Sequence, residues 1–157
     1  MQEEIKTMIS SGESQVRAVY DQLLHCWNKR DASAFANLFH EHGYTIGFDG
    51  TLSNGKNEIQ HHLATVFENH ITATYVSIVR NVQAIEHSVW ILRADVGMIP
   101  PGKNEINPKL NAIQSLVLVR TNNGFRIAFL QNTPAAFHGR PEAAEQLTIE
   151  LNKSHGQ

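Results

Sequence analysis

One stretch decides the fold of this chain: NAIQSLVLVRTNNGFRIAFLQN, residues 111–132. Two runs of β-branched and aromatic residues flank Asn-Asn-Gly, a triplet that supplies the positive-φ residues of a tight turn. We therefore predict a hairpin whose strands pair antiparallel on either side of this turn. The pairing is expected to gather four carboxamides at the far end of a curved sheet, those of Asn111, Gln114, Gln131 and Asn132. Amides in that position can orient a small ligand by hydrogen bonds without strong acid or base chemistry.

The alternating pattern of the hairpin extends upstream to about residue 72. It predicts four long strands, at residues 74–85, 88–98, 111–121 and 125–132. Glu86-His87 is long enough only for a hairpin connection, whereas Ile99 to Lys109 contains three prolines and a glycine and is expected to form a mobile flap.

Helical periodicity governs the rest of the chain. Apolar residues from Val16 to Trp27 recur at helical spacing after a possible capping box at Ser10 and Glu13. A short second helix is predicted over residues 31–39, a strand over 44–49 and a third helix over 56–69. A last amphipathic helix begins at Pro141 and precedes a polar tail, residues 152–157.

This order predicts an α+β fold, a cystatin-like cone in which a strongly bent antiparallel sheet wraps around the N-terminal helices. Residues 1–157 fit a single domain, of which residues 140–157 form the C-terminal helix and polar tail. Curling of the sheet around the first helix is expected to leave a cavity on the concave face, where a function would reside.

Composition narrows the possible partners. Thirteen basic and fifteen acidic residues give a net charge of -2, and the absence of a run of like charges argues against nucleic acid or a polybasic membrane surface. No segment approaches the ~20 apolar residues that span a bilayer, so we expect a cytoplasmic protein. Cys26 stands alone and is interpreted as a buried thiol rather than a nucleophile.

Several recurring segments resemble the nuclear transport factor 2-like superfamily, and within it the SnoaL-like, SgcJ/EcaC-type bacterial proteins. The specific segments are Gly97-Met-Ile-Pro-Pro-Gly102, Asn111-Ala-x-Gln-Ser-Leu-Val117 and Gln131-Asn-Thr-Pro134; Trp27-Asn-x-x-Asp31 and Phe48-x-Gly-Thr51 are more general. The resemblance implies a cone-shaped domain that forms a homodimer through the outer sheet face. No GxGxxG turn or other nucleotide motif indicates a redox cofactor, and no cofactor is expected.

The superfamily includes ketosteroid isomerase and polyketide cyclases, whose catalytic pattern transfers poorly to this chain. The resemblance places a catalytic aspartate near the end of the first strand, where Asp49 follows Phe48. Asp49 is then either a general base whose pKa is raised by an apolar cavity or a residue of the Asp-Gly turn. Tyr20 or Tyr44 would stabilise the developing oxyanion, although the spacing of Tyr20 and Asp95 departs from that of the isomerases.

Other residues are candidates for the cavity wall or for structural roles. Trp27, Tyr44 and Phe48 would line an apolar pocket, and Trp27 would serve a core equally well. The amides could line the pocket or satisfy backbone groups, and Gln131 and Asn132, being adjacent, should point to opposite faces unless a bulge intervenes. No metal site is expected, because His40 and His42 lack a third ligand at regular spacing and the helical neighbours His61 and His62 diverge.

Three functions remain open. The first is a homodimeric domain that binds a small apolar molecule through Trp27, Tyr44, Gln114 and Asn132. The second is a cofactor-independent lyase, isomerase or cyclase that uses Asp49 as its base. The third is a protein-interaction module whose cavity is filled by side chains. An enzyme requires an inward Asp49 with a raised pKa, a binder requires only an open cavity, and an interaction module requires neither.

Overall fold

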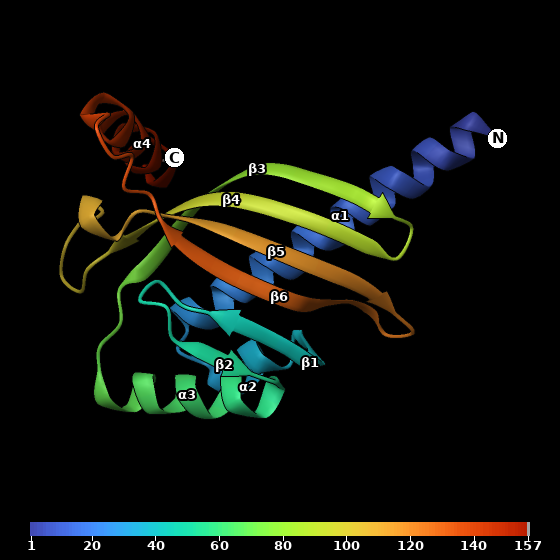
Figure 1. Cartoon of the computed structure of the whole chain (residues 1–157), viewed down its shortest axis with the longest axis horizontal. Helices are drawn as coiled ribbons and strands as arrows, with labels where there is room; N and C mark the ends of the chain where they lie inside the picture. Colours follow the sequence, from blue (N-terminus) through green and yellow to red (C-terminus); the bar gives the residue numbers. More distant parts are fainter. Residues whose placement is uncertain (157) are drawn as a thin grey trace.

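A computed structural model describes residues 1–156 (Figure 1). The elements follow one another as α1 (Gln2–Asn28), α2 (Ala32–Ala36), β1 (Phe39–Ile46), β2 (Leu52–Asn54), α3 (Lys56–Asn69), β3 (Thr74–Glu86), β4 (Val89–Ile99), the 3-10 helix η1 (Pro108–Leu110), β5 (Ala112–Thr121), β6 (Gly124–Pro134) and α4 (Pro141–His155). Across these residues no helix has both the length and the apolar character required to cross a membrane.

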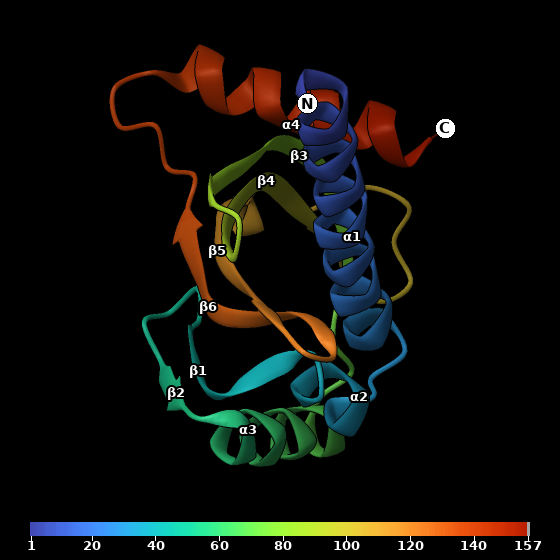
Figure 2. The same cartoon turned by 90° about the vertical axis from the view of Figure 1, so that its right-hand side faces the viewer.

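The six strands form one sheet in the order β2-β1-β6-β5-β4-β3. Neighbouring strands are antiparallel except β1 and β6, which run parallel, so the sheet is mixed rather than wholly antiparallel as predicted. The sheet curls strongly, α1 runs along the open side of the curl, and α2 and α3 lie at one end (Figure 2). The predicted α+β cone is therefore confirmed.

The predicted hairpin consists of β5, β6 and the turn between them. Thr121 pairs with Gly124 at the turn, and Gln114 pairs with Asn132 near the far end. The register shifts once. Val117 pairs with Phe129 and Leu118 pairs with Ile127, so Ala128 is an extra residue in β6. Such a bulge reverses the facing of every residue beyond it. Beyond Ala128, therefore, the even-numbered residues of β6 share the concave face with the even-numbered residues of β5.

The main core lies between α1 and the concave face of the sheet. Val16, Tyr20 and Leu23 on α1 are at most 1% exposed, and they belong to the same cluster as Leu92 and Leu116 on the central strands. Each such side chain contributes roughly 1.5–3 kcal/mol by leaving water. The helical stripe and the strand alternation seen in the sequence are therefore two sides of one interface.

Several predicted boundaries shift in the structure. Helix α1 begins at Gln2, so Ser10 and Glu13 lie inside it and form no cap, because Ile5, Met8 and Ile9 continue the apolar spacing without a helix breaker. Strand β1 begins at Phe39, which was assigned to the second helix, and β2 was not predicted. Helix α4 extends through His155 into the predicted polar tail, of which Gln157 lies outside the described residues.

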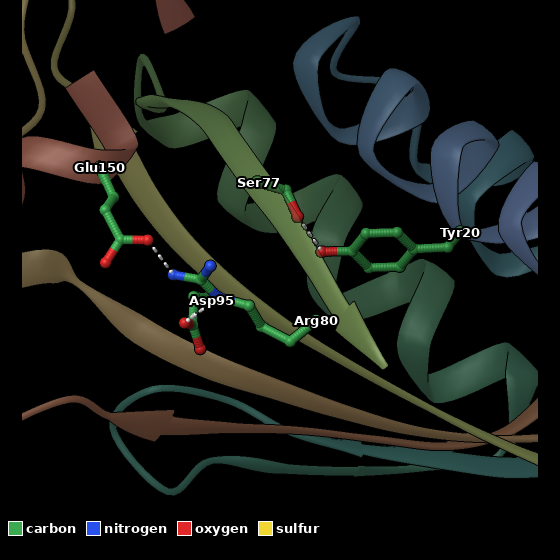
Figure 3. Close-up of polar contacts among 5 residues, drawn as sticks. All are labelled: Tyr20, Ser77, Arg80, Asp95 and Glu150. Atoms are coloured by element: carbon green, nitrogen blue, oxygen red, sulfur yellow. Dashed lines mark hydrogen bonds and ion pairs between the residues drawn. The ribbon is translucent and has the colours of Figure 1, made fainter. Parts of the chain in front are cut away.

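Helix α4 covers one end of the outer sheet face. Leu147 and Leu151 pack there against Val76 and Ile99 in a second apolar cluster. An ionic network accompanies it: Arg80 bonds to Asp95 on β4 and to Glu150 on α4, each at 2.7 Å (Figure 3). Asp95 thus pairs with Arg80 on the neighbouring strand β3.

The proline-rich segment between β4 and β5 is anchored rather than free at its centre. Ile106 is buried in the second cluster, and its backbone N–H donates to Oδ1 of Asn152 on α4. The backbone N–H of Asn107 also donates to the carbonyl of Met98. These contacts argue against the predicted role of the whole segment as a flap.

Candidate functional site

The concave face and the helices enclose a cavity of about 270 Å³. Its wall combines residues of α1, α2, α3, all six strands and the loop between β1 and β2. Apolar side chains such as Leu24, Leu63 and Leu130 make up most of it. Pockets of this character, apolar with a few convergent polar groups, are typical of small-molecule sites. The cavity expected from the curvature of the sheet is present.

Trp27 forms the centre of an aromatic wall, as predicted. Its ring lies 5.2 Å from that of Tyr75 and 5.3 Å from that of Phe67, and it also contacts Phe35 at 6.4 Å. The indole N–H donates to the carbonyl of Ala73 at 3.0 Å, so the polar tip of Trp27 is satisfied by the backbone. The indole therefore offers the cavity an apolar surface.

Only two of the four predicted carboxamides reach the cavity. Gln114 and Asn132 pair across β5 and β6 and both line it. Gln131 points to the outer face, where it pairs with Ser115. Asn111 lies at the other side of the sheet, with its Nδ2 donating to Oγ1 of Thr148 on α4 at 3.0 Å. The expectation that all four would gather around a ligand was wrong, because the side chains of adjacent strand residues point to opposite faces. The bulge at Ala128 decides that Asn132, and not Gln131, faces the cavity.

Tyr20 does not line the cavity, but it contacts Gln114, which does. It is fully buried, its hydroxyl donates to Oε1 of Gln114 at 2.6 Å, and it lies 2.7 Å from Oγ of Ser77 (Figure 3). Burial raises the pKa of Tyr20, so its hydroxyl stays protonated. The predicted oxyanion role is not supported, since the hydroxyl is committed to positioning Gln114.

Tyr44 lies on the opposite face from the cavity. Its ring is 4.8 Å from that of Phe129, with which it pairs across β1 and β6, and its side chain is 39% exposed. The neighbouring residue Thr45 faces inward and lines the cavity instead. Predicting Tyr44 as a cavity residue was an error of one position in the strand register.

Phe48, Asp49, Thr51 and His62 line the cavity where it is most exposed, and we call these four residues the rim. Oδ1 of Asp49 accepts the backbone N–H of Thr51 at 2.9 Å, and the backbone N–H of Gly50 donates to the carbonyl of Gly47. The hydrogen bond from Thr51 lowers the pKa of the Asp49 carboxyl, with a smaller contribution from His62. Asp49 is therefore a turn residue, and the raised pKa expected of a general base is absent.

Tyr75, Met98 and His62 are among the lining residues that the sequence prediction missed. Tyr75 and Met98 pair across β3 and β4 on the concave face, and His62 reaches the rim from α3. The alternation of Tyr75, Ser77 and Val79 was the signal that could have identified the first of them. His62 carried none, because its helix presents Ile59, Leu63 and Val66 to the sheet and His62 lies beside that stripe.

The histidine pairs do not gather further ligands. The rings of His40 and His42 are 5.8 Å apart, and the backbone N–H of His42 donates to Nδ1 of His40. Within residues 1–156, no group of three His, Cys, Asp or Glu side chains is arranged to hold a metal ion.

Comparison with known proteins places this architecture in a family. The model of the SnoaL-like domain matches residues 16–135. A cystatin-like domain of unknown function from Nostoc punctiforme is 23% identical, with a TM-score of 0.77, over 94% of this chain and 98% of that one. A nuclear transport factor 2-like protein with a cystatin-like fold from Novosphingobium aromaticivorans is 14% identical, with a TM-score of 0.64, over 92% and 93% of the two chains.

A ketosteroid isomerase-like protein from Erwinia carotovora atroseptica has a TM-score of 0.62 at 15% identity, over 79% of this chain and 96% of that one. No curated protein matches the sequence. At these identities the structural likeness concerns the fold alone. The family match spans most of the chain and includes the strands and helices that form the cavity. The chain therefore belongs to the SnoaL-like domain family.

Proposed function

We propose that this protein binds a small, mostly apolar molecule in the cavity beneath α1. The observation that carries the proposal is the arrangement of its wall: apolar and aromatic side chains surround a few polar groups, among which Tyr75, Gln114 and Asn132 converge from three strands. A volume of about 270 Å³ suits a compact ring compound rather than a peptide or a dinucleotide.

Binding without catalysis fits the polar groups better than a lyase or isomerase does. Proton abstraction at neutral pH requires a base with a suitable pKa within reach of the substrate. Asp49 is the only carboxylate among the described lining residues, and its hydrogen bond from Thr51 lowers its pKa. The amides and Tyr75 can polarise a bound group but cannot supply this base. His62, the one imidazole among the described lining residues, lies at the exposed rim and not among the polar groups inside the cavity.

The two tryptophans provide a test of binding. Trp27 lines the cavity, whereas Trp90 packs at the far end of the core against Phe125. Titration with a panel of compact ring compounds should change the fluorescence of the parent protein and of Trp90→Phe, but not that of Trp27→Phe. Native mass spectrometry of the purified protein would identify any molecule that already occupies the site.

Filling the cavity gives a second, independent test. Val66 on α3 lines the cavity, so Val66→Phe should abolish the fluorescence response. Ala64 is exposed on the same helix, and Ala64→Phe is the matched control that should leave binding unchanged. A response that survives in a folded Val66→Phe protein would contradict binding in this cavity. The absence of any bound compound would favour the interaction-module alternative.

We also propose a homodimer formed through the outer sheet face. This face carries an apolar group comprising Tyr44, Phe129, Ile46 and Leu52, the last of which is 56% exposed. Exposed apolar groups of this kind commonly mark protein contacts. Helix α4 covers the other end of the face, so the partner would contact β1, β2, β5 and β6.

A further inference from the structure

One amide of the cavity has its orientation determined by the protein. The hydroxyl of Tyr20 donates a hydrogen bond to Oε1 of Gln114 at 2.6 Å. The same hydroxyl lies 2.7 Å from Oγ of Ser77 (Figure 3). Because Gln114 is buried and its oxygen is already bonded, its NH₂ group is the part available to the cavity. Gln114 therefore contributes hydrogen-bond donors.

Tyr75 lies beside this amide and is also a donor. Burial raises the pKa of Tyr75 to about 12, and a hydrogen bond with Gln114 offsets part of that effect. The phenol is consequently neutral and protonated at physiological pH. Its hydroxyl can donate a hydrogen bond to a molecule in the cavity.

Asn132, in contrast, supplies a hydrogen-bond acceptor. Its Oδ1 is buried and has no hydrogen-bond partner within residues 1–156. Asn132 pairs with Gln114 across the sheet and both residues line the cavity, so the two amides are neighbours on its wall. A buried carbonyl oxygen without a partner destabilises the protein, and a ligand that donates to it removes that cost.

The residues that line the cavity disfavour an anionic ligand. No lysine or arginine is among its lining residues, and the ionisable groups Asp49 and His62 lie at the rim. A carboxylate next to Oδ1 of Asn132 would face a carbonyl dipole with no cation to neutralise it. The wall thus favours a neutral molecule.

We infer that the cavity selects a neutral alcohol on an apolar ring, whose hydroxyl donates to Oδ1 of Asn132 and accepts a hydrogen bond from Gln114 or Tyr75. A hydroxyl group suits this arrangement because it donates and accepts at a single atom. The inference rests on the proposed binding function and adds the chemical class of the ligand.

Three probes with one ring system test the inference on the unmodified protein: 1-indanol, 1-methoxyindane and indane-1-carboxylate. Protein-observed NMR titration measures each dissociation constant. We expect 1-indanol to bind at least roughly tenfold more tightly than 1-methoxyindane, which accepts but cannot donate, and the carboxylate to bind most weakly. If the methyl ether binds as tightly as the alcohol, or the carboxylate binds more tightly, the inference is wrong while the binding function stands.

A pair of neighbouring variants isolates the acceptor. Asn132→Leu should weaken 1-indanol to the affinity of 1-methoxyindane and leave the ether unaffected, whereas Gln131→Leu, on the outer face of the same strand, should change neither. An alcohol preference that persists in Asn132→Leu would overturn the role of Asn132. If none of the three probes binds the parent protein and no compound of the wider panel does, the proposed function itself fails.

Discussion

Removal of the Tyr20 hydroxyl tests whether the cavity rests on a buried polar network. The hydroxyl forms hydrogen bonds of 2.6 Å with Gln114 and 2.7 Å with Ser77 inside the core. Tyr20→Phe deletes both and leaves Oε1 of Gln114 buried without a partner. Loss of the bond to Ser77 costs about 1 kcal/mol and the unpaired acceptor of Gln114 costs about 1–3 kcal/mol, so we expect a loss of about 2–4 kcal/mol in the free energy of unfolding.

Urea denaturation at a constant protein concentration measures this loss, and Tyr44→Phe is the control. The Tyr44 side chain is partly exposed on the outer face, and its substitution should change stability by less than about 0.5 kcal/mol. In a thermal scan, Tyr20→Phe should lower Tm by about 5–12 °C for a domain of this size.

A double-mutant cycle with Gln114→Leu separates the unpaired acceptor from the other effects. When leucine replaces Gln114, loss of the Tyr20 hydroxyl leaves no amide oxygen without a partner. The further loss in the free energy of unfolding should then fall to about 1 kcal/mol. An equal cost in both backgrounds would refute the reasoning, as would a change below about 0.5 kcal/mol for Tyr20→Phe alone.

The remaining predictions concern the rim, α4 and the outer face. Carboxyl NMR titration should place the pKa of Asp49 below the ordinary range, and Asp49→Asn should retain ligand binding; a raised pKa would restore the general-base hypothesis. Arg80 lowers the pKa of Glu150, so this ion pair contributes stability above the ordinary pKa of the carboxyl and loses it as the pH falls through the lowered value. The Tm difference between Arg80→Met and the parent should accordingly be larger at pH 7 than in strong acid, and a difference independent of pH would contradict the ion-pair explanation. Phe129→Arg should convert a dimer to a monomer in analytical ultracentrifugation, whereas Gln60→Arg on the exposed side of α3 should not; a parent protein that is monomeric would end the dimer proposal.

The sequence by itself determined the elements and their amphipathic faces. Helical spacing from Val16 to Trp27, the Asn-Asn-Gly turn and the alternation of the four long strands are local signals, and the structure confirms each of them. They were sufficient for the α+β cone and for its cavity, because a strand or helix that is apolar on one side must bury that side. The helical spacing also placed Trp27 on the apolar face of its helix, but left open whether it lines the cavity or packs in the core.

Only the tertiary structure decided which polar groups meet in the cavity. Strict alternation from Phe125 would turn Gln131 inward and Asn132 outward, but the bulge at Ala128 reverses them. Similarly, one position in β1 separates Tyr44 outside from Thr45 inside. A bulge arises from the fit between paired strands rather than from either strand alone, so a local pattern predicts the two faces but not which of two adjacent residues reaches the ligand.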